Sequence, residues 1–167
     1  MTRIAKLTTT LGLVALAAGA QAQSLYGEVG YTGLDYREPG LKASPGMVRG
    51  VVGYEFSPNL AMEGMVGLHG GSDTASGTTL KLGNMVGVFG KVQAPLAEGV
   101  NVYGRLGVAR SDLKANGVSD ARTGLAYGVG MSYDLSKTTY LNADYTKYYD
   151  RRDQKLEGVT LGVGFRF

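Results

Sequence analysis

The sequence predicts an all-β fold, an eight-stranded antiparallel up-and-down transmembrane β-barrel, and three observations lead to it. From residue 23 onward apolar side chains recur at every second residue, which is the period of a strand and not of a helix. Turn-forming residues divide this pattern into eight segments, close to the 9–11 residues that a tilted membrane-crossing strand needs. The last segment, "GVTLGVGFRF" at 158–167, alternates without a break and ends on an aromatic residue.

Residues 1–22, "MTRIAKLTTTLGLVALAAGAQA", precede this pattern and are expected to form a cleaved signal peptide. Arg3 and Lys6 come first, a short apolar stretch follows, and an Ala-Gln-Ala cleavage site ends the segment. The apolar stretch is shorter than the roughly 18–20 residues of a membrane-spanning helix. Residues 23–167 are then the barrel domain. Two of the 17 basic residues leave with the peptide, so 15 basic and 14 acidic residues remain, a net charge of +1.

The first four segments, 25–32, 48–56, 60–69 and 80–91, each carry bulky apolar side chains on one face. The opposite face holds small residues and a few charges, which alternation brings to the other side of a strand. In chain order the apolar faces consist of Leu25, Val29, Tyr31; Val48, Val52, Tyr54, Phe56; Leu60, Met62, Val66, Leu68; and Leu80, Leu82, Val86, Val88.

The second four segments, 100–108, 122–133, 141–146 and 158–167, repeat the arrangement. The polar faces are again poor in bulky side chains, and their charged members are Arg105, Arg122, Asp144 and Arg166. In chain order the apolar faces consist of Val100, Val102, Leu106, Val108; Leu125, Tyr127, Val129, Met131, Tyr133; Leu141, Ala143, Tyr145; and Val159, Leu161, Val163, Phe165, Phe167.

The connections alternate between long and short, as in a barrel whose two ends differ. Four of them are long and polar, at 36–46, 69–78, 110–121 and 149–157, and three are mostly shorter, at 57–59, 93–99 and 136–139. Short turns face the periplasm and long loops face outward in outer-membrane barrels. We therefore expect both termini on the periplasmic side and four extracellular loops.

Lipid is the medium that fits the two faces. Rows of Leu and Val facing water would form an extended exposed apolar surface, whereas in a bilayer they are stable. The small and charged residues would fill the narrow interior of an eight-stranded barrel. The alternative is a soluble secreted barrel that binds a small apolar ligand, with the same two faces inverted.

Two hairpin stretches and the C-terminal strand carry a family resemblance. "GVVGYEFSPNLAMEG" at 50–64 and "YGVGMSYDLSKTTYLNADY" at 127–145 each join an aromatic-ended strand, a short turn and a new strand. They resemble hairpins of the small OmpA/OmpX-type outer-membrane β-barrel superfamily, and the resemblance spans residues 25–167. It implies that Val163, Phe165 and Phe167 belong to the C-terminal signal for insertion by the barrel assembly machinery. The superfamily includes structural proteins, adhesins, resistance factors and a few enzymes.

Charged residues on the polar faces are the candidate site. We expect them to pair in the lumen, because an unpaired buried ion costs several kcal/mol. A plug of paired charges is one interpretation, with Glu28, Arg49, Glu55, Glu63, Lys81 and Arg105 at its centre; a narrow ion path is the other. The full set consists of Glu28, Arg49, Glu55, Glu63, Lys81, Lys91, Arg105, Arg122, Asp144 and Arg166, with Asp134 near the periplasmic rim.

Other chemistries have little support in the sequence. Cysteine is absent, metal-ligand spacing is not found, and no basic tract suggests nucleic-acid binding. His69 is the one histidine. It is not part of a closely spaced His-x-Ser pair, which the small lipid A deacylase barrels of the superfamily that the chain resembles carry. We expect no cofactor, no metal and no catalytic residue.

Aromatic residues are expected to form girdles at the two membrane surfaces, where a ring sits in lipid and a hydroxyl in water. The proposed girdle members near the periplasmic ends are Tyr54, Phe56, Tyr133, Tyr140, Phe165 and Phe167; those toward the middle or outer side are Tyr31, Tyr36, Tyr127, Tyr145, Tyr148 and Tyr149.

The sequence thus predicts a monomeric, non-enzymatic barrel in the outer membrane of a Gram-negative bacterium. Its expected role is membrane integrity or surface interaction, such as adhesion or resistance, through the four loops. Its partners would be outer-membrane lipid, lipopolysaccharide and a possible host ligand, the last two at charged stretches such as "YYDRRDQK" at 148–155. A narrow channel and a lipid A-modifying barrel enzyme remain the alternatives.

Overall fold

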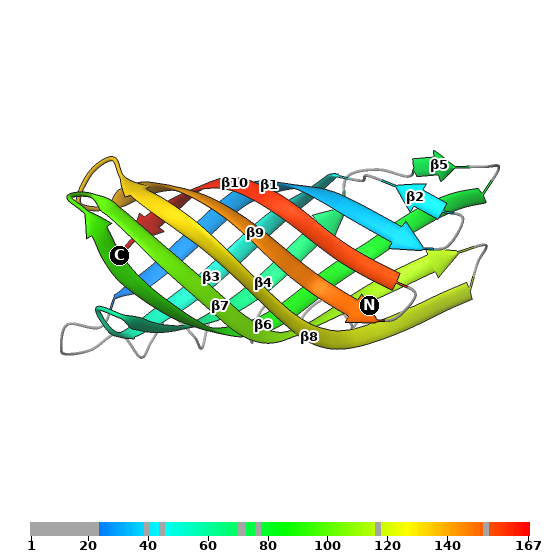
Figure 1. Cartoon of the computed structure of the whole chain (residues 1–167), viewed down its shortest axis with the longest axis horizontal. Coiled ribbons are helices and arrows are strands. Elements are labelled where there is room, and N and C mark those ends of the chain that lie inside the picture. The colour runs from blue at the N-terminus through cyan, green and yellow to red at the C-terminus, as the bar shows by residue number, and fades with distance from the viewer. Residues whose placement is uncertain are drawn as a thin grey trace, which may run out of the picture.

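Eight long antiparallel strands form a closed barrel in the computed structural model, which describes residues 24–38, 41–43, 46–69, 73–75, 78–115, 118–151 and 154–167 (Figure 1). The expected signal peptide, 1–22, lies outside the described residues. In this part of the chain no helix is long and apolar enough to cross a membrane. The barrel strands are β1 (Leu25–Glu38), β3 (Gly46–Ser57), β4 (Leu60–His69), β6 (Thr78–Ala97), β7 (Val100–Ala115), β8 (Val118–Asp134), β9 (Thr139–Arg151) and β10 (Gln154–Arg166).

Two further strands of three residues extend the rim at one end. β2 (Leu41–Ala43) pairs with β1, and β5 (Asp73–Ala75) pairs with β6. Both lie at the end of the barrel opposite the C-terminus (Figure 1). We call this the loop end, and the end with Phe167 and the turns at 58–59, 98–99 and 135–138 the turn end.

The barrel closes between its first and last strands. β1 and β10 pair antiparallel from Tyr26↔Arg166 to Arg37↔Lys155. Beyond the last pair, the Phe167 N–H donates a hydrogen bond of 2.9 Å to the Leu25 carbonyl. Because each of the eight barrel strands then has two neighbours, the barrel wall has no open edge, which is the condition for placing strands in lipid.

The two faces of the wall follow the alternation in the sequence. Outward apolar side chains are highly exposed, among them Val29 at 61 %, Val129 at 65 % and Leu161 at 67 %. Inward side chains are buried even when charged, as Glu63 is at 1 %. The apolar face is therefore the outer one, which contradicts the soluble-barrel alternative with its inverted faces.

Strands are longer than the sequence pattern predicts. The expected connections 110–121 and 149–157 are mostly strand, because β7 runs to Ala115, β8 starts at Val118, β9 runs to Arg151 and β10 starts at Gln154. Apolar alternation ends where the lipid contact ends, but the backbone ladder continues beyond it. Strand length in the loop-end half is thus invisible to a hydropathy pattern.

The expected connection 93–99 is also mostly strand. β6 continues through Pro95 to Ala97, and only Glu98 and Gly99 form the turn. Pro95 is tolerated because it pairs with Asn101 of β7, whereas the pairing of β6 with β4 already ends at Val92. Gly99 has a φ of 71°, a left-handed conformation that favours glycine.

Most of the aromatic residues assigned to the girdles lie on the outer face and two do not, while Tyr36 and Tyr149 lie outside the residues whose side chains the structure describes. Phe56, Tyr133 and Phe165 are exposed on the outer face, as is Phe167 at 81 %. Tyr140 and Tyr148, which the sequence assigned to the girdles, are instead buried in the lumen. They share the parity of Asn142, Asp144 and Thr146 on β9, and this parity decides their direction. The role of Val163, Phe165 and Phe167 as an insertion signal stays a prediction.

Inward glycines make room for the rings of lumenal tyrosines. A Cβ added at Gly164 would overlap the Tyr140 ring, and one at Gly53 would overlap the Tyr26 ring. Outward glycines such as Gly90 face open space, since the nearest atom to a Cβ there would be the Leu106 carbonyl oxygen at 3.9 Å. Side-chain volume is therefore limited at Gly53 and Gly164 on the inner face and not at Gly90 on the outer face.

Gly164→Ala should destabilise the barrel by about 1–3 kcal/mol, because the added methyl group overpacks the lumen against Tyr140. Equilibrium unfolding in urea with lipid vesicles, followed by the mobility of unboiled samples on gels, measures this loss. The matched control is Gly90→Ala, which should change stability by less than about 0.5 kcal/mol. Equal losses for both variants would contradict the steric argument.

Candidate functional site: the barrel lumen

Six charged side chains from six strands meet in the lumen. Three are acidic and three are basic, so the group is formally neutral, and each is no more than 5 % exposed. We call it the central network: Glu28 of β1, Arg49 of β3, Glu63 of β4, Lys91 of β6, Arg105 of β7 and Asp144 of β9. Neutrality matters because an excess ion in this space would lack a partner and cost several kcal/mol.

Arg49 and Asp144 form the most direct pair of the network. Arg49 Nη1 donates to Asp144 Oδ1 at 2.9 Å, and Nη2 makes a second, very short contact with Oδ2. This two-point geometry is the strongest arrangement for a guanidinium and a carboxylate. Thr146 also donates to Oδ1 at 2.9 Å, and the Tyr103 hydroxyl donates to Oδ2 at 3.3 Å. The contacts hold the Asp144 carboxylate in one orientation.

Neutral donors hold the two glutamates. The Tyr140 hydroxyl donates to Glu28 Oε1 at 2.9 Å, and the Asn142 amide donates to Glu28 Oε2 at 2.8 Å. The Tyr26 hydroxyl donates to Glu63 Oε1 at 2.7 Å. Tyrosine and asparagine therefore replace water as the hydrogen-bond donors of these buried carboxylates.

Arg105 lies among all three carboxylates without bonding closely to any of them. Its guanidinium nitrogens are 3.5 Å from Glu63, 3.7 Å from Asp144 and 3.8 Å from Glu28. None of these nitrogens has a hydrogen-bond partner of good geometry, and neither does Glu63 Oε2. Arg105 therefore contributes charge balance more than directed bonding.

Lys91 completes the network between two aromatic rings. Its ammonium lies 4.7 Å from the centre of the Tyr26 ring and 4.5 Å from that of Tyr103. It also lies 3.4 Å from Glu63 and 3.8 Å from Glu28. The two ring faces and the two carboxylates all attract the ammonium electrostatically.

Two of the charges predicted for the lumen lie nearer the turn end and have other partners. Glu55 accepts a hydrogen bond of 3.0 Å from Gln93 Nε2, and Arg166 donates to Asp134 at 2.8 Å. Arg166 also stacks over the Tyr140 ring, 4.5 Å from its centre. Glu55 is thus not central, whereas Lys91 and Asp144 are. Lys81, Arg122 and His69 lie outside the residues whose side chains the structure describes.

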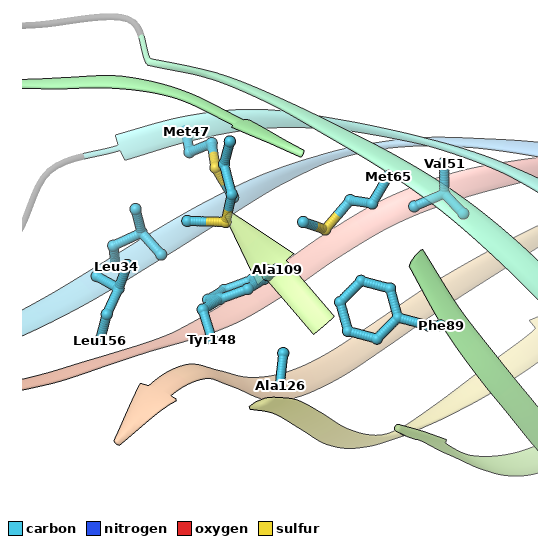
Figure 2. Packing of buried hydrophobic residues seen from close by; sticks show 10 residues of the cluster. Leu34, Met47, Val51, Met65, Phe89, Ala109, Ala126, Tyr148 and Leu156 are labelled. Carbon is cyan, nitrogen blue, oxygen red and sulfur yellow. The ribbon is translucent and has the colours of Figure 1, made fainter. Parts of the chain in front are cut away.

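Apolar side chains fill the lumen on the loop-end side of the network (Figure 2). Each of the eight barrel strands contributes at least one, so they form a complete ring inside the wall. We call this ring the apolar collar: Leu34, Met47, Val51, Met65, Met85, Phe89, Ala109, Ala126, Tyr148 and Leu156. In Figure 2 the Met65 side chain and the Phe89 ring both reach toward the middle of the ring. On β3, Arg49 lies between Met47 and Val51; on the other five strands that carry a network charge, the collar side chains lie nearer the loop end than the charge.

The uncharged members of the site were not singled out from the sequence. Tyr26, Tyr103, Asn142 and Thr146 share the inward parity with the charges, and this parity was the available signal. The chemistry of the assembled site is that of paired, neutralised charge. Among the described residues no group of three or more His, Cys, Asp or Glu side chains could hold a metal ion.

Comparison with known proteins agrees with this geometry. The outer membrane protein beta-barrel domain family matches residues 8–167, and the chain therefore belongs to that family. No curated protein matches the chain significantly. The protein is accordingly an outer-membrane β-barrel of the OmpA/OmpX type, located in the outer membrane of a Gram-negative bacterium.

Several solved outer-membrane barrels have the same fold. Ail of Yersinia pestis, solved in complex with the heparin analogue sucrose octasulfate, is 24 % identical with a TM-score of 0.68, covering 88 % of this chain and 100 % of Ail. Neisserial surface protein A is 20 % identical with a TM-score of 0.63, covering 87 % and 98 %. The N-terminal barrel of Pseudomonas aeruginosa OprF is 15 % identical with a TM-score of 0.60, covering 86 % and 97 %.

Asp144→Ala should lower the free energy of unfolding by about 3–5 kcal/mol, because it leaves Arg49 buried without its carboxylate. Urea unfolding in lipid vesicles measures the change. The half-buried pair at the turn end supplies the control: Asp134→Ala should cost at most about 1 kcal/mol, since water reaches Arg166 and screens its charge.

The double variant Arg49→Met/Asp144→Leu removes both charges and keeps the network neutral. It should therefore be more stable than Asp144→Ala alone. A double variant as unstable as the single one would show that packing, and not the charge left behind, causes the loss.

Proposed function

We propose that this member of the outer-membrane β-barrel domain family is a closed, non-catalytic barrel whose lumen is plugged and whose loop end contacts surface ligands. The observation that carries the proposal is the stacking of two different layers in one narrow lumen. The neutral central network fills one level, and the apolar collar from all eight barrel strands fills the next.

The two layers oppose ion passage by different means. A permeating ion would have to displace one member of an ion pair in the network. The other member would then stay buried without a partner in a medium of low dielectric constant. In the collar it would have to lose its hydration shell among apolar side chains, at a cost of order 20 kcal/mol in the ideal case of ε near 4. Either layer alone is sufficient to block conduction.

A narrow channel is the second candidate, and one observation favours it. The Arg105 nitrogens lack close hydrogen bonds, so this side chain is the least firmly held member of the network. Its displacement would open a path through the network only as far as the apolar collar. Because the collar remains, we rank the plug above the channel.

Planar-bilayer recordings test the plug. The wild-type barrel and the collar variant Met65→Ala/Phe89→Ala should give no stable unitary steps, because the network still blocks the lumen. Adding Arg105→Ala to the collar variant should produce stable steps, since both layers are then broken. The mobility shift between boiled and unboiled samples verifies that each variant is a closed barrel.

Two results of these recordings would overturn the plug proposal. Reproducible steps in the wild-type protein would favour the channel instead. A triple variant that is folded and yet silent would show that the named residues are not what closes the lumen.

Surface contact is the second part of the proposed function. Ail, a barrel of the same fold, was solved with a heparin analogue bound. In this chain the sequence of 148–155 contains Arg151, Arg152 and Lys155, and β9 ends at the loop end with Arg151. Basic side chains suit a polysulfated ligand, since each sulfate offers a charge-assisted hydrogen bond.

The barrel in detergent should bind immobilised heparin at low salt and elute as salt rises, because screening weakens exposed charges. Arg151→Glu/Arg152→Glu should abolish this retention. Lys137→Glu, a single reversal in the turn 135–138 at the opposite end, should leave it unchanged. If the wild type is not retained, or if both variants lose retention equally, basic side chains at the loop end are not the contact for the ligand.

A further inference from the structure

The outer wall of the barrel has a shallow groove in a region that should face lipid. It has a volume of about 730 Å³ and crosses the strands from β6 to β10. We call it the wall groove; its side chains include Val92, Ala94, Val102, Gly104, Val129 and Ala143. The outward direction is clear from exposure, since Val92 is 60 % and Val129 is 65 % exposed.

Small outward residues make the wall groove deeper. Gly104 and Ala143 occupy outward positions that carry Val, Leu, Met or Tyr in most of the surrounding wall. A Cβ at Gly104 would be 3.9 Å from its nearest neighbours, Gly128 O and Val92 Cγ2, so the space above this glycine is open. Strand twist gives a barrel a narrowed waist, and small residues at the waist turn that shape into a groove.

The groove is almost entirely apolar and continuous with the lipid-facing surface. Water is a poor occupant, because it finds too few hydrogen-bond partners there. An empty groove is also unfavourable, since its lining loses dispersion contacts on one side. The acyl chains that touch the exposed apolar residues on either side supply the missing contacts.

One end of the groove marks its depth in the membrane. Tyr145 lines the groove, and its hydroxyl donates a hydrogen bond of 2.7 Å to the Glu157 carboxylate. Glu157 pairs along the sheet with Lys147, so charged side chains begin one step toward the loop end from Tyr145. The groove therefore runs from the middle of the barrel, at Tyr145, toward the turn end, where Ala94 and Val102 lie close to the turn 98–99.

We propose that the wall groove is a binding seat for an acyl chain of a lipid in the leaflet at the turn end. The seat recognises the chain and not the headgroup, because its lining is apolar. A second barrel is the competing occupant, and we disfavour it because its wall is convex and carries bulky side chains over most of its surface. This inference does not depend on whether the lumen conducts.

Electron paramagnetic resonance of a chain-labelled lipid tests the proposal. The full barrel is placed in phosphatidylcholine vesicles that contain phosphatidylcholine with a nitroxide on its acyl chain. The wild type should show a motionally restricted lipid component with slow exchange. Gly104→Leu fills the groove and should reduce that component, whereas phosphatidylglycerol carrying the same label should behave like phosphatidylcholine.

Gly64→Leu and Gly90→Leu are the matched controls. Both glycines face outward with similarly open space, the nearest atoms to an added Cβ being carbonyl oxygens at 4.0 Å and 3.9 Å, and neither lines the groove. These variants should keep the restricted component. An equally large restricted component in Gly104→Leu and in the wild type would overturn the proposal. Chemical cross-linking of the wild type into dimers that Gly104→Leu abolishes would also overturn it, because a second barrel would then occupy the groove.

Discussion

Closure of the hydrogen-bond ladder between β1 and β10 is the constraint on which the other features depend. Twelve residue pairs join the two strands, and the Phe167 N–H extends the ladder to Leu25. A closed ladder lets the backbone enter lipid, but it also encloses whatever side chains point inward. With eight strands the enclosed space is only wide enough for side chains. The inner face must consequently satisfy its own charges, and the neutral central network does so.

The size of the lumen also explains where glycine and tyrosine occur. A tyrosine ring can lie flat over the neighbouring strand when the residue opposite it lacks a Cβ, as Tyr140 lies over Gly164 and Tyr26 over Gly53. The hydroxyl at the far end of each ring then reaches a carboxylate, Glu28 or Glu63. The same two tyrosines therefore determine both the packing and the hydrogen bonding in this part of the lumen.

Alternation in the sequence was sufficient for the fold, the eight strands and the direction of the described side chains. It predicted the face of Glu28, Arg49, Glu63, Lys91, Arg105 and Asp144, because parity depends only on position within a strand. It could not predict height along the barrel or partners, which depend on register between strands far apart in the sequence. Glu55 was therefore expected at the centre, although it lies near the turn end beside Gln93. Tyr140 and Tyr148 were misassigned because a general preference of tyrosine for interfaces was given more weight than parity.

The wall is one residue thick, and this makes its two faces separately adjustable. On β8, Gly130 points inward beneath the Tyr103 ring, while its neighbours Val129 and Met131 point outward and line the wall groove. A change at an inward position alters the packing of the network without changing the lipid contact, and a change at an outward position does the reverse. The collar and the groove can therefore serve different purposes within the same strands. The outer wall and the loop end can therefore interact with other molecules independently of what the interior contains.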